Sequence, residues 1–223
     1  MIELEKHLGH VFKNTNQLHQ ALTHISTTKT NADSNERLEF LGDRVLGLIV
    51  ANMLFESFKE EDEGDLAYRF AALVKRETLA HVAREIKLGD FIKLSVGERE
   101  TGGAEKDSVL ANTCEALIAA LYLDGGFAAA NNFIRYYWGP LLEKDPKPPK
   151  DPKTSLQEWA QAAGRSLPEY TVTNRRGPDH APLFTVEVKV SGEIPTRGEG
   201  SNKQTAEQAA AKILLAQLVD VKK

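Results

Sequence analysis

The sequence has little of several things, and each shortage excludes a class of protein. One cysteine among 223 residues rules out an internal disulfide and favours the reducing cytoplasm. No run approaches the ~20 apolar residues of a membrane span, and the first residues lack the basic region and apolar block of a secretory signal. Basic residues do not predominate, since the net charge is −4. Composition thus argues mildly against nucleic-acid binding, and any such function must rest on placed residues.

What is present begins with residues 35–52, which predict a helix capped by Ser34 or Asn35. At ~100° per residue its apolar side chains share one arc: Leu38, Leu41, Val45, Leu46, Leu48 and Ile49. Three carboxylates form a separate stripe, Glu36, Glu39 and Asp43, and the basic Arg37 and Arg44 are expected to point elsewhere.

Two features of this acidic segment should lower the stability of its helix. Like charges on one stripe repel one another, and Gly42 and Gly47 each lower helix propensity by roughly 1 kcal/mol relative to Ala. A divalent cation held by the carboxylates explains both. The alternative, commoner for an arbitrary Glu-x-x-Glu, is a solvated acidic face.

A second helix is predicted over residues 107–124, closed by Gly125 and Gly126. Its interior is apolar nearly all round, which indicates burial. Two strongly polar residues interrupt it, Asn112 and Glu115, three apart on one face. A buried carboxylate costs several kcal/mol unless it is paired or metal-bound, and no Lys or Arg stands three or four residues away. We therefore expect the two acidic helices to meet around a cation.

The remaining pattern predicts two domains. Further helices are expected at 16–25, 66–86 and 128–142, with an irregular glycine-rich stretch at 87–106. Four prolines within 143–153 indicate an extended spacer. Beyond it, capping-box spacings at 154–157 and 201–204 open two helices around strands at 170–174, 183–191 and 193–197. The last helix should turn inward Ala206, Ala210, Ile213, Leu214 and Leu218. One antiparallel sheet with both helices on one face accounts for this half.

Residues 35–43 read Asn-Glu-Arg-Leu-Glu-Phe-Leu-Gly-Asp. Further short motifs lie at 21–24, 102–103, 115–126, 156–158, 177–180 and 198–210. In these segments the chain resembles bacterial ribonuclease III, which cuts double-stranded RNA, over about residues 1–220. The resemblance implies an all-α N-terminal endonuclease domain at 1–144 and a proline-rich linker at 145–153. It further implies an α+β (α-β-β-β-α) double-stranded-RNA-binding domain at 154–220.

The resemblance also implies an activity and its residues. Water would attack phosphorus in line, with one Mg²⁺ lowering the pKa of the water and a second stabilising the departing 3′ oxygen. The enzyme would act in the processing of ribosomal and other structured RNA. Asp43 and Glu115 would be catalytic; Glu39, Asn112 and Glu115 would hold the metal; Glu36 would assist substrate binding. Mn²⁺ should substitute for Mg²⁺, and zinc is not expected without paired histidine or cysteine.

Partners follow from the same resemblance. The family forms homodimers through the catalytic domain, and Phe40 stands just outside the main apolar arc. Duplex RNA would be bound by residues in the second domain: Gln157, Glu158, His180, Ser201 and Lys203. Gln204 stands where the family usually has a second basic residue, so we expect modest affinity and a shallow salt dependence.

One residue departs from the family pattern, because Asn112 replaces an expected aspartate. An amide oxygen is neutral and binds Mg²⁺ more weakly than a carboxylate. The change is either a natural variant whose other carboxylates suffice, or an engineered substitution. The alternative function is a double-stranded-RNA-binding dimer whose nuclease half is catalytically impaired.

Overall fold

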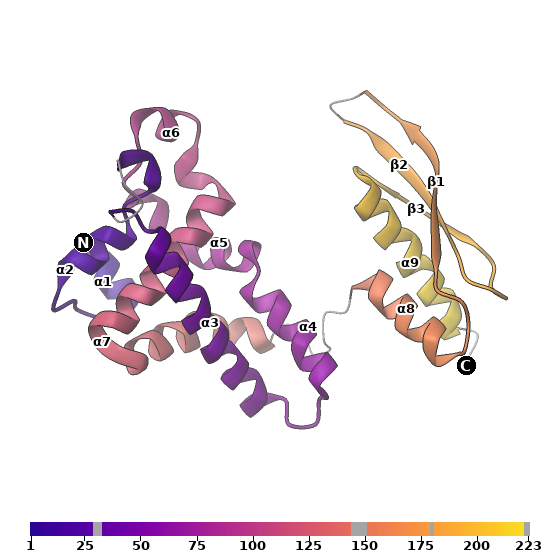
Figure 1. The fold of residues 1–223 in the computed structure, drawn as a ribbon, viewed down its shortest axis with the longest axis horizontal. Helices are drawn as coiled ribbons and strands as arrows, with labels where there is room; N and C mark the ends of the chain where they lie inside the picture. Colours follow the sequence, from indigo (N-terminus) through magenta and orange to yellow (C-terminus); the bar gives the residue numbers. More distant parts are fainter. Residues whose placement is uncertain (29–32, 144–150, 179–180, 221–223) are drawn as a thin grey trace. The chain divides into compact units, whose positions relative to one another are not determined.

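The computed structural model describes residues 1–28, 33–143, 151–178 and 181–220. The chain divides into two compact units, Met1–Pro149 and Lys150–Lys223. The first unit is built of helices, and the second has a three-stranded sheet between two helices along the chain (Figure 1). The predicted fold class, a helical domain followed by an α-β-β-β-α domain, is confirmed.

The helices of the first unit share one core. They are α1 Ile2–Leu8, α2 Thr15–Ala21, α3 Glu36–Ser57, α4 Glu63–Val74, α5 Arg76–Glu85, α6 Val96–Glu100 and α7 Asp107–Glu143, with 3-10 turns at Ile25–Thr27, Leu88–Asp90 and Gly103–Glu105. Leu46 and Ile49 of α3 are fully buried, as are Leu117 and Trp138 of α7. The Trp138 indole donates a hydrogen bond to the Leu73 carbonyl at 2.9 Å. Core burial thus joins α3 to α7, the two helices expected to carry the acidic residues.

Helix α7 is bent where the sequence places a glycine pair. Gly126 has φ 71° and ψ −171°, a backbone conformation that residues other than glycine rarely adopt. Asp124, just before it, accepts hydrogen bonds from His10 Nε2 at 2.7 Å and from the backbone N–H groups of Lys13 and Asn14 at 3.0 and 2.8 Å. By length and composition, Asp107–Leu142 is the one helix in the described ranges that could span a membrane. Most of its first half lies in the core.

Some first-unit predictions are wrong. The expected helix at 66–86 is two helices, because Lys75 is extended (φ −70°, ψ 156°) and Thr78 donates its hydroxyl to the Ala72 carbonyl at 2.7 Å. The helix expected to reach residue 25 ends at Ala21. Leu48, assigned to the buried arc, is 62% exposed.

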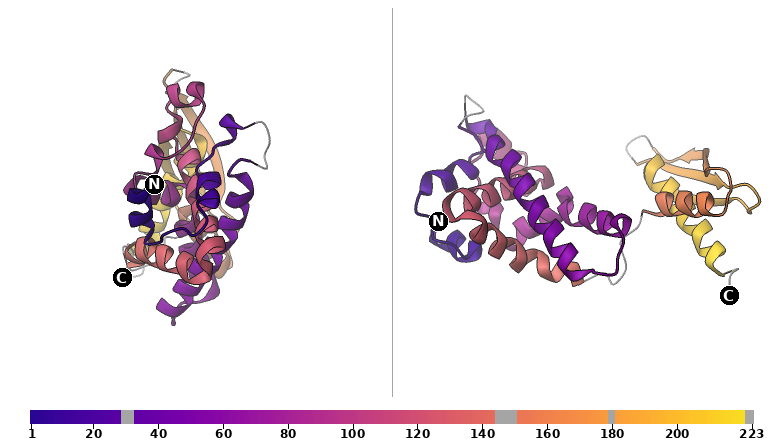
Figure 2. Two further views of the ribbon diagram at one scale, coloured as in Figure 1. Left: turned by 90° about the vertical axis from the view of Figure 1, so that its left-hand side faces the viewer. Right: turned by 60° about the horizontal axis from the view of Figure 1, so that its bottom comes forward.

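The second unit packs both helices on one side of its sheet (Figure 2). Its elements are α8 Pro152–Ala162, β1 Glu169–Arg176, β2 Leu183–Lys189, β3 Thr196–Gly200 and α9 Lys203–Asp220. The strands are antiparallel in the order β1-β2-β3, and Val186 pairs with Val172 and Gly198. At Gly198 an added Cβ would lie 2.1 Å from the Ala210 nitrogen, so only glycine lets β3 approach α9 this closely.

The ends of these elements differ from the predictions. Asp151 caps α8 by accepting from Lys153 N at 2.9 Å, so the helix starts before the capping box expected at 154–157. Asn202 rather than Ser201 caps α9, accepting from Thr205 N at 2.9 Å. Strand β3 starts at Thr196, beyond Pro195, which lacks the N–H that a central ladder needs. Ile213, predicted inward, is 43% exposed.

Candidate active site

The two acidic helices meet at Gly42. A Cβ added there would lie 1.8 Å from the backbone oxygen of Glu115, far inside any permitted contact. Gly42 therefore allows α3 to lie directly against α7 at the turn that carries Glu115. The prediction that acidic residues from two distant segments come together is confirmed at this crossing.

Three of the predicted site side chains converge beside the crossing. The Asn112 side chain lies close enough to the Glu39 carboxylate to lower the pKa of Glu39. Glu39 is also close enough to Glu115 for its negative charge to disfavour ionisation of the second carboxyl. All three side chains are partly exposed, at the edge of an otherwise buried part of α7. A ligand in solvent can therefore reach their oxygens.

The electrostatics of these carboxyls are unfavourable without a cation. Burial, and then the charge of Glu39, raise the pKa of Glu115 to about 7, although Arg44 opposes the shift. Burial and the charge of Glu36 raise the pKa of Glu39, and the nearby Asn112 amide offsets part of that rise. A positive ion between the two carboxylates would relieve both penalties.

The other two carboxylates of the acidic stripe, Glu36 and Asp43, have partners of their own. Asp43 contacts the Arg44 guanidinium, which also lies 5.2 Å from the centre of the Phe40 ring. The expectation that Arg44 points elsewhere is therefore wrong. Glu36 is exposed and accepts from the Ser34 hydroxyl at 3.5 Å. No group of three His, Cys, Asp or Glu side chains suited to a metal ion occurs in the described ranges.

The donor set still fits a hard divalent cation. Two carboxylates and an amide offer only oxygen ligands, and Mg²⁺ commonly keeps several waters while using one or two protein carboxylates. The neighbouring Cys114 is fully buried, and burial raises the pKa of its thiol, so it stays neutral. Cysteine-based metal binding or nucleophilic attack is not available at this position.

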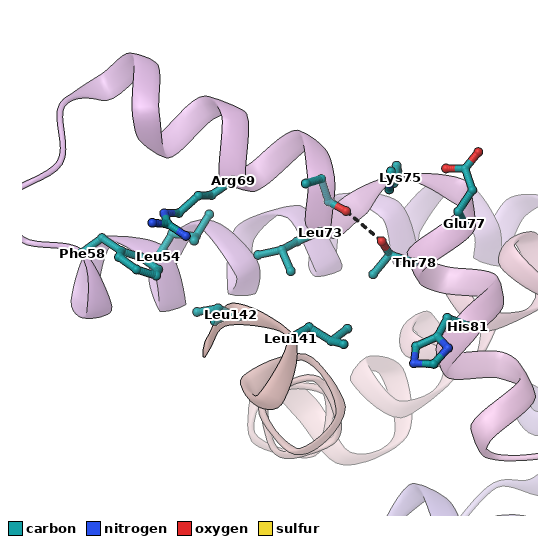
Figure 3. Close-up of a pocket in the computed structure, with 11 residues that line it drawn as sticks. Leu54, Phe58, Arg69, Leu73, Lys75, Glu77, Thr78, His81, Leu141 and Leu142 are labelled. Carbon is teal, nitrogen blue, oxygen red and sulfur yellow. Dashed lines mark hydrogen bonds between the residues drawn. The ribbon is translucent and has the colours of Figure 1, made fainter. Parts of the chain in front are cut away.

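A well-formed cavity of about 340 Å³ lies elsewhere, between α4, α5 and the end of α7. Leucines line its middle, Arg69 and Phe58 lie at one end, and His81 lies at the other (Figure 3). None of the predicted site residues lines it. A pocket of this size also suits a small molecule better than a nucleic-acid duplex, so the crossing at Gly42 remains the candidate site.

A shallower pocket of about 580 Å³ adjoins the acidic helix. Seven residues line it: Gln20, Glu36, Arg37, Leu38, Phe40, Leu41 and Leu123. Phe40 is 67% exposed and Leu123 46% exposed, and both line this pocket, so two large apolar side chains are exposed side by side. This surface lies next to the candidate site and is suited to cover by another chain.

In the second unit, the predicted RNA-binding residues that are described all lie on the surface. Gln157 and Glu158 are exposed on α8, and Ser201 and Lys203 are exposed at the start of α9. Lys203 Nζ is 3.8 Å from Glu207, one turn further along. His180 lies outside the described residues.

An oxygen-lined crossing in a helical unit, followed by an α-β-β-β-α module, is the arrangement that the sequence led us to expect for a nuclease with a separate RNA-binding module. Comparison with known proteins specifies the family. Residues 14–140 match the family model described as Ribonuclease-III-like, and residues 152–218 match the double-stranded RNA binding motif. The chain belongs to the ribonuclease III family, whose members are endonucleases of double-stranded RNA and are generally metal-dependent.

Individual relatives agree with this assignment. Ribonuclease 3 of Caulobacter vibrioides is 50% identical over 216 residues, covering 96% of this chain and 94% of that protein. Ribonuclease 3 of Cereibacter sphaeroides is 47% identical over 214 residues, covering 96% and 93%. A crystal structure of the ribonuclease III nuclease domain from Campylobacter jejuni is 43% identical, with a TM-score of 0.61, covering 65% of this chain and 98% of that one.

Proposed function

We propose that this chain is an active Mg²⁺-dependent endoribonuclease that hydrolyses phosphodiester bonds of double-stranded RNA. The observation that carries the proposal is the convergence of Glu39 and Glu115 at the Gly42 crossing, in a chain of this family. Processing of ribosomal and other structured RNA, in the cytoplasm, is the role that the family suggests.

Within this proposal the residues have distinct tasks. Glu39 and Glu115 hold the metal, and the Asn112 amide orients the Glu39 carboxylate while its own oxygen remains a candidate ligand. When bound, the divalent cation supplies an activated water nucleophile and stabilises the charge that develops at phosphorus and on the leaving oxygen. Asp43 completes or orders the set once it is released from Arg44, and the exposed Glu36 contacts substrate.

The second unit supplies affinity and selects duplex RNA. The major groove of A-form RNA is too narrow for side chains, so recognition uses 2′-hydroxyls of the minor groove and phosphates. We assign Gln157 and Glu158 to the hydroxyls, and Ser201 and Lys203 to a phosphate near the start of α9. His180 is assigned to a second minor-groove contact on the resemblance alone.

A homodimer fits the apolar surface beside the site. A related structure of the nuclease domain from Campylobacter jejuni, 45% identical with a TM-score of 0.58 and covering 60% of this chain and 93% of that one, concerns a region involved in dimer formation. We propose that the exposed Phe40 and Leu123 are covered by a second copy. A twofold dimer would present one site to each strand of a duplex.

A cleavage assay on the purified protein tests the proposal. Duplex RNA, single-stranded RNA and duplex DNA are incubated with Mg²⁺, with Mn²⁺ and with a chelator. We expect cuts in duplex RNA alone, with either metal and not with the chelator. Cleavage that persists in the chelator, or that ignores strandedness, would contradict it.

The second candidate is a duplex-RNA-binding dimer with an impaired nuclease half, and Asn112 is the observation that favours it. It predicts duplex binding without cleavage in Mg²⁺. The variant Asn112→Asp adds a carboxylate to the site and should raise the rate in either case. An unchanged rate would show that the amide is not what limits the site.

A further inference from the structure

The Asn35 side chain does not cap helix α3, although its position favours capping. Asn35 stands at the N-cap of α3, where asparagine is among the preferred capping residues. Its side chain nevertheless makes no capping hydrogen bond. Ser34 replaces it, because the Glu36 N–H donates to the Ser34 hydroxyl at 3.4 Å. The Asn35 amide is therefore available for a contact outside its own helix.

That contact is with the helix that carries the rest of the site. Asn35 Nδ2 donates to the Thr113 hydroxyl at 3.4 Å, linking α3 to α7 across 78 positions of the chain. Asn35 is 3% exposed and Thr113 is 0% exposed. A buried polar pair costs free energy if either partner is lost, whereas an apolar pair of the same shape is nearly neutral. Such a pair therefore contributes geometry more than stability.

Backbone hydrogen bonds connect Asn35 to Glu39, one of the proposed metal ligands. The Glu39 N–H donates to the Asn35 carbonyl at 2.8 Å, and the Asn35 N–H donates to the Thr23 carbonyl at 2.9 Å. Thr113 follows Asn112 directly in α7, and the Asn112 side chain lies near the Glu39 carboxylate. The second close approach of the helices, Gly42 against Glu115, lies seven residues further along α3. The two anchor points thus flank Glu39.

We infer that Asn35 and Thr113 are a positioning pair that fixes α3 on α7, so that Glu39 is held against Asn112 and Glu115 in the arrangement that binds a divalent cation. This inference rests on the proposed function, since it assumes that these carboxylates bind metal. Neither residue contacts the ion or the RNA. Loss of the pair loosens the arrangement of the ligands.

Thr113→Val tests the pair with little change in volume, because it replaces the hydroxyl with a methyl group. Thr113→Ser is the matched control, because it keeps the hydroxyl. Mn²⁺ binding to the full-length, RNA-free protein is measured by calorimetry. We expect Thr113→Val to weaken Mn²⁺ binding roughly 10-fold, as for the loss of a hydrogen bond behind a metal ligand. Thr113→Ser should stay within about 2-fold of the parent, since the bond is retained.

Further measurements separate positioning from general damage. In cleavage assays, Thr113→Val should raise the Mg²⁺ concentration that gives half-maximal rate and leave the KM for duplex RNA unchanged. Asn35→Ala should weaken Mn²⁺ binding as well, and the double variant should bind no more weakly than the weaker single variant, because one interaction is removed. Additive losses, equal losses in Thr113→Val and Thr113→Ser, or parental binding in Thr113→Val would each overturn the inference.

The variant Glu115→Gln distinguishes the two levels of the proposal. If Glu115→Gln abolishes Mn²⁺ binding while Thr113→Val leaves it intact, the metal site stands and the positioning pair does not. If the parent protein binds no Mn²⁺, or binds it regardless of Glu115, the proposed metal site is wrong and the positioning pair is wrong with it.

Discussion

The two units place their functional residues in opposite ways. In the helical unit, Glu39 and Glu115 lie half-buried at a helix crossing, and their electrostatics depend on each other. In the second unit, Gln157, Glu158 and Lys203 are exposed on α8 and at the start of α9. A catalytic arrangement needs fixed distances between charged groups, which only a packed core supplies. A duplex-binding surface needs side chains that extend to the RNA and donate hydrogen bonds, and exposed side chains can do both.

Each unit nevertheless has a glycine where another element approaches a helix closely. Gly42 lets α3 meet the Glu115 backbone, and Gly198 lets β3 meet the Ala210 backbone. The consequences of filling these two positions should differ. In the first unit the loss includes catalysis, and in the second it should be limited to binding.

The largest effect is expected from Gly42→Ala. The new Cβ would meet a backbone oxygen that no side-chain rotation can move, so α3 must shift from α7. We expect destabilisation of roughly 3 kcal/mol, at the upper end for overpacking, and loss of cleavage. Thermal unfolding and a duplex cleavage assay check both.

Gly47→Ala is the matched control on the same helix. Its Cβ would meet only the Phe70 ring, at 3.5 Å, an ordinary contact. The substitution should be neutral or stabilising by up to about 1 kcal/mol through helix propensity. Equal damage from the two alanines would mean that the close approach at Gly42 is not special.

Glu115→Gln should remove catalysis and spare binding. The amide keeps the size of the side chain and removes the charge that holds the metal, which is worth several kcal/mol, so we expect a rate loss on the order of 10³-fold. Duplex affinity, measured by gel shift with Ca²⁺ in place of Mg²⁺, should stay within a few-fold. Glu60→Gln, exposed in the α3–α4 loop, is the control and should cleave normally. Parallel loss of binding and cleavage would indicate that Glu115 is structural.

Gly198→Ala should give the reverse result. Its Cβ would lie 2.1 Å from the Ala210 nitrogen, so β3 and α9 must separate. We expect duplex binding to fail at physiological salt while cleavage persists at low salt, where electrostatic attraction is stronger. The neighbouring exposed Glu199→Ala should change little, because surface ion pairs contribute about 0–1 kcal/mol. Loss of cleavage at low salt would show that the nuclease unit needs the second unit for more than affinity.

A smaller effect concerns pH and Glu115. Its folded-state pKa of about 7 lies above the ordinary 4.5, so the folded protein binds the proton more tightly. The contribution of this group to the free energy of unfolding therefore decreases as pH rises from about 4.5 to 7. We compare the free energy of unfolding of Glu115→Gln with that of the parent, both without metal. This difference should be about 1–2 kcal/mol more favourable to the variant at pH 8 than at pH 4.5, after allowance for solvent screening.

Chelator-treated samples of both proteins, unfolded by urea at several pH values, measure this difference. Mg²⁺ should then stabilise the parent at pH 8 and not the variant. A stability difference that does not change with pH would contradict the raised pKa of Glu115.

The meeting of the two acidic helices could be predicted because polar residues in an otherwise apolar helix need partners. The reason for Gly42 could not be predicted, because a cation accounts for Gly42 and Gly47 alike in the sequence, whereas the close contact between the helices explains Gly42. The break at Lys75 was missed because apolar spacing continues across it from Leu73 to Leu79. Ser34 or Asn35 was expected to cap α3, and Ser34 accepts the Glu36 N–H. The bond from Asn35 to Thr113 depends on a residue too distant in sequence for local rules to find.

The smallest effect is expected at Lys203, which contrasts most sharply with the coupled residues of the first unit. Lys203 is exposed at the start of α9. Its ion pair with Glu207, at 3.8 Å, is weak because the lysine side chain lies in solvent, so the amine is available to a phosphate. Removing one phosphate contact should weaken duplex binding a few-fold and reduce the salt slope by about 1. The matched control is Lys212→Ala, exposed in the middle of the same helix. Gel shifts across a salt series compare them. Equal slopes for Lys203→Ala and Lys212→Ala would mean that the start of α9 makes no phosphate contact, and that binding rests on α8.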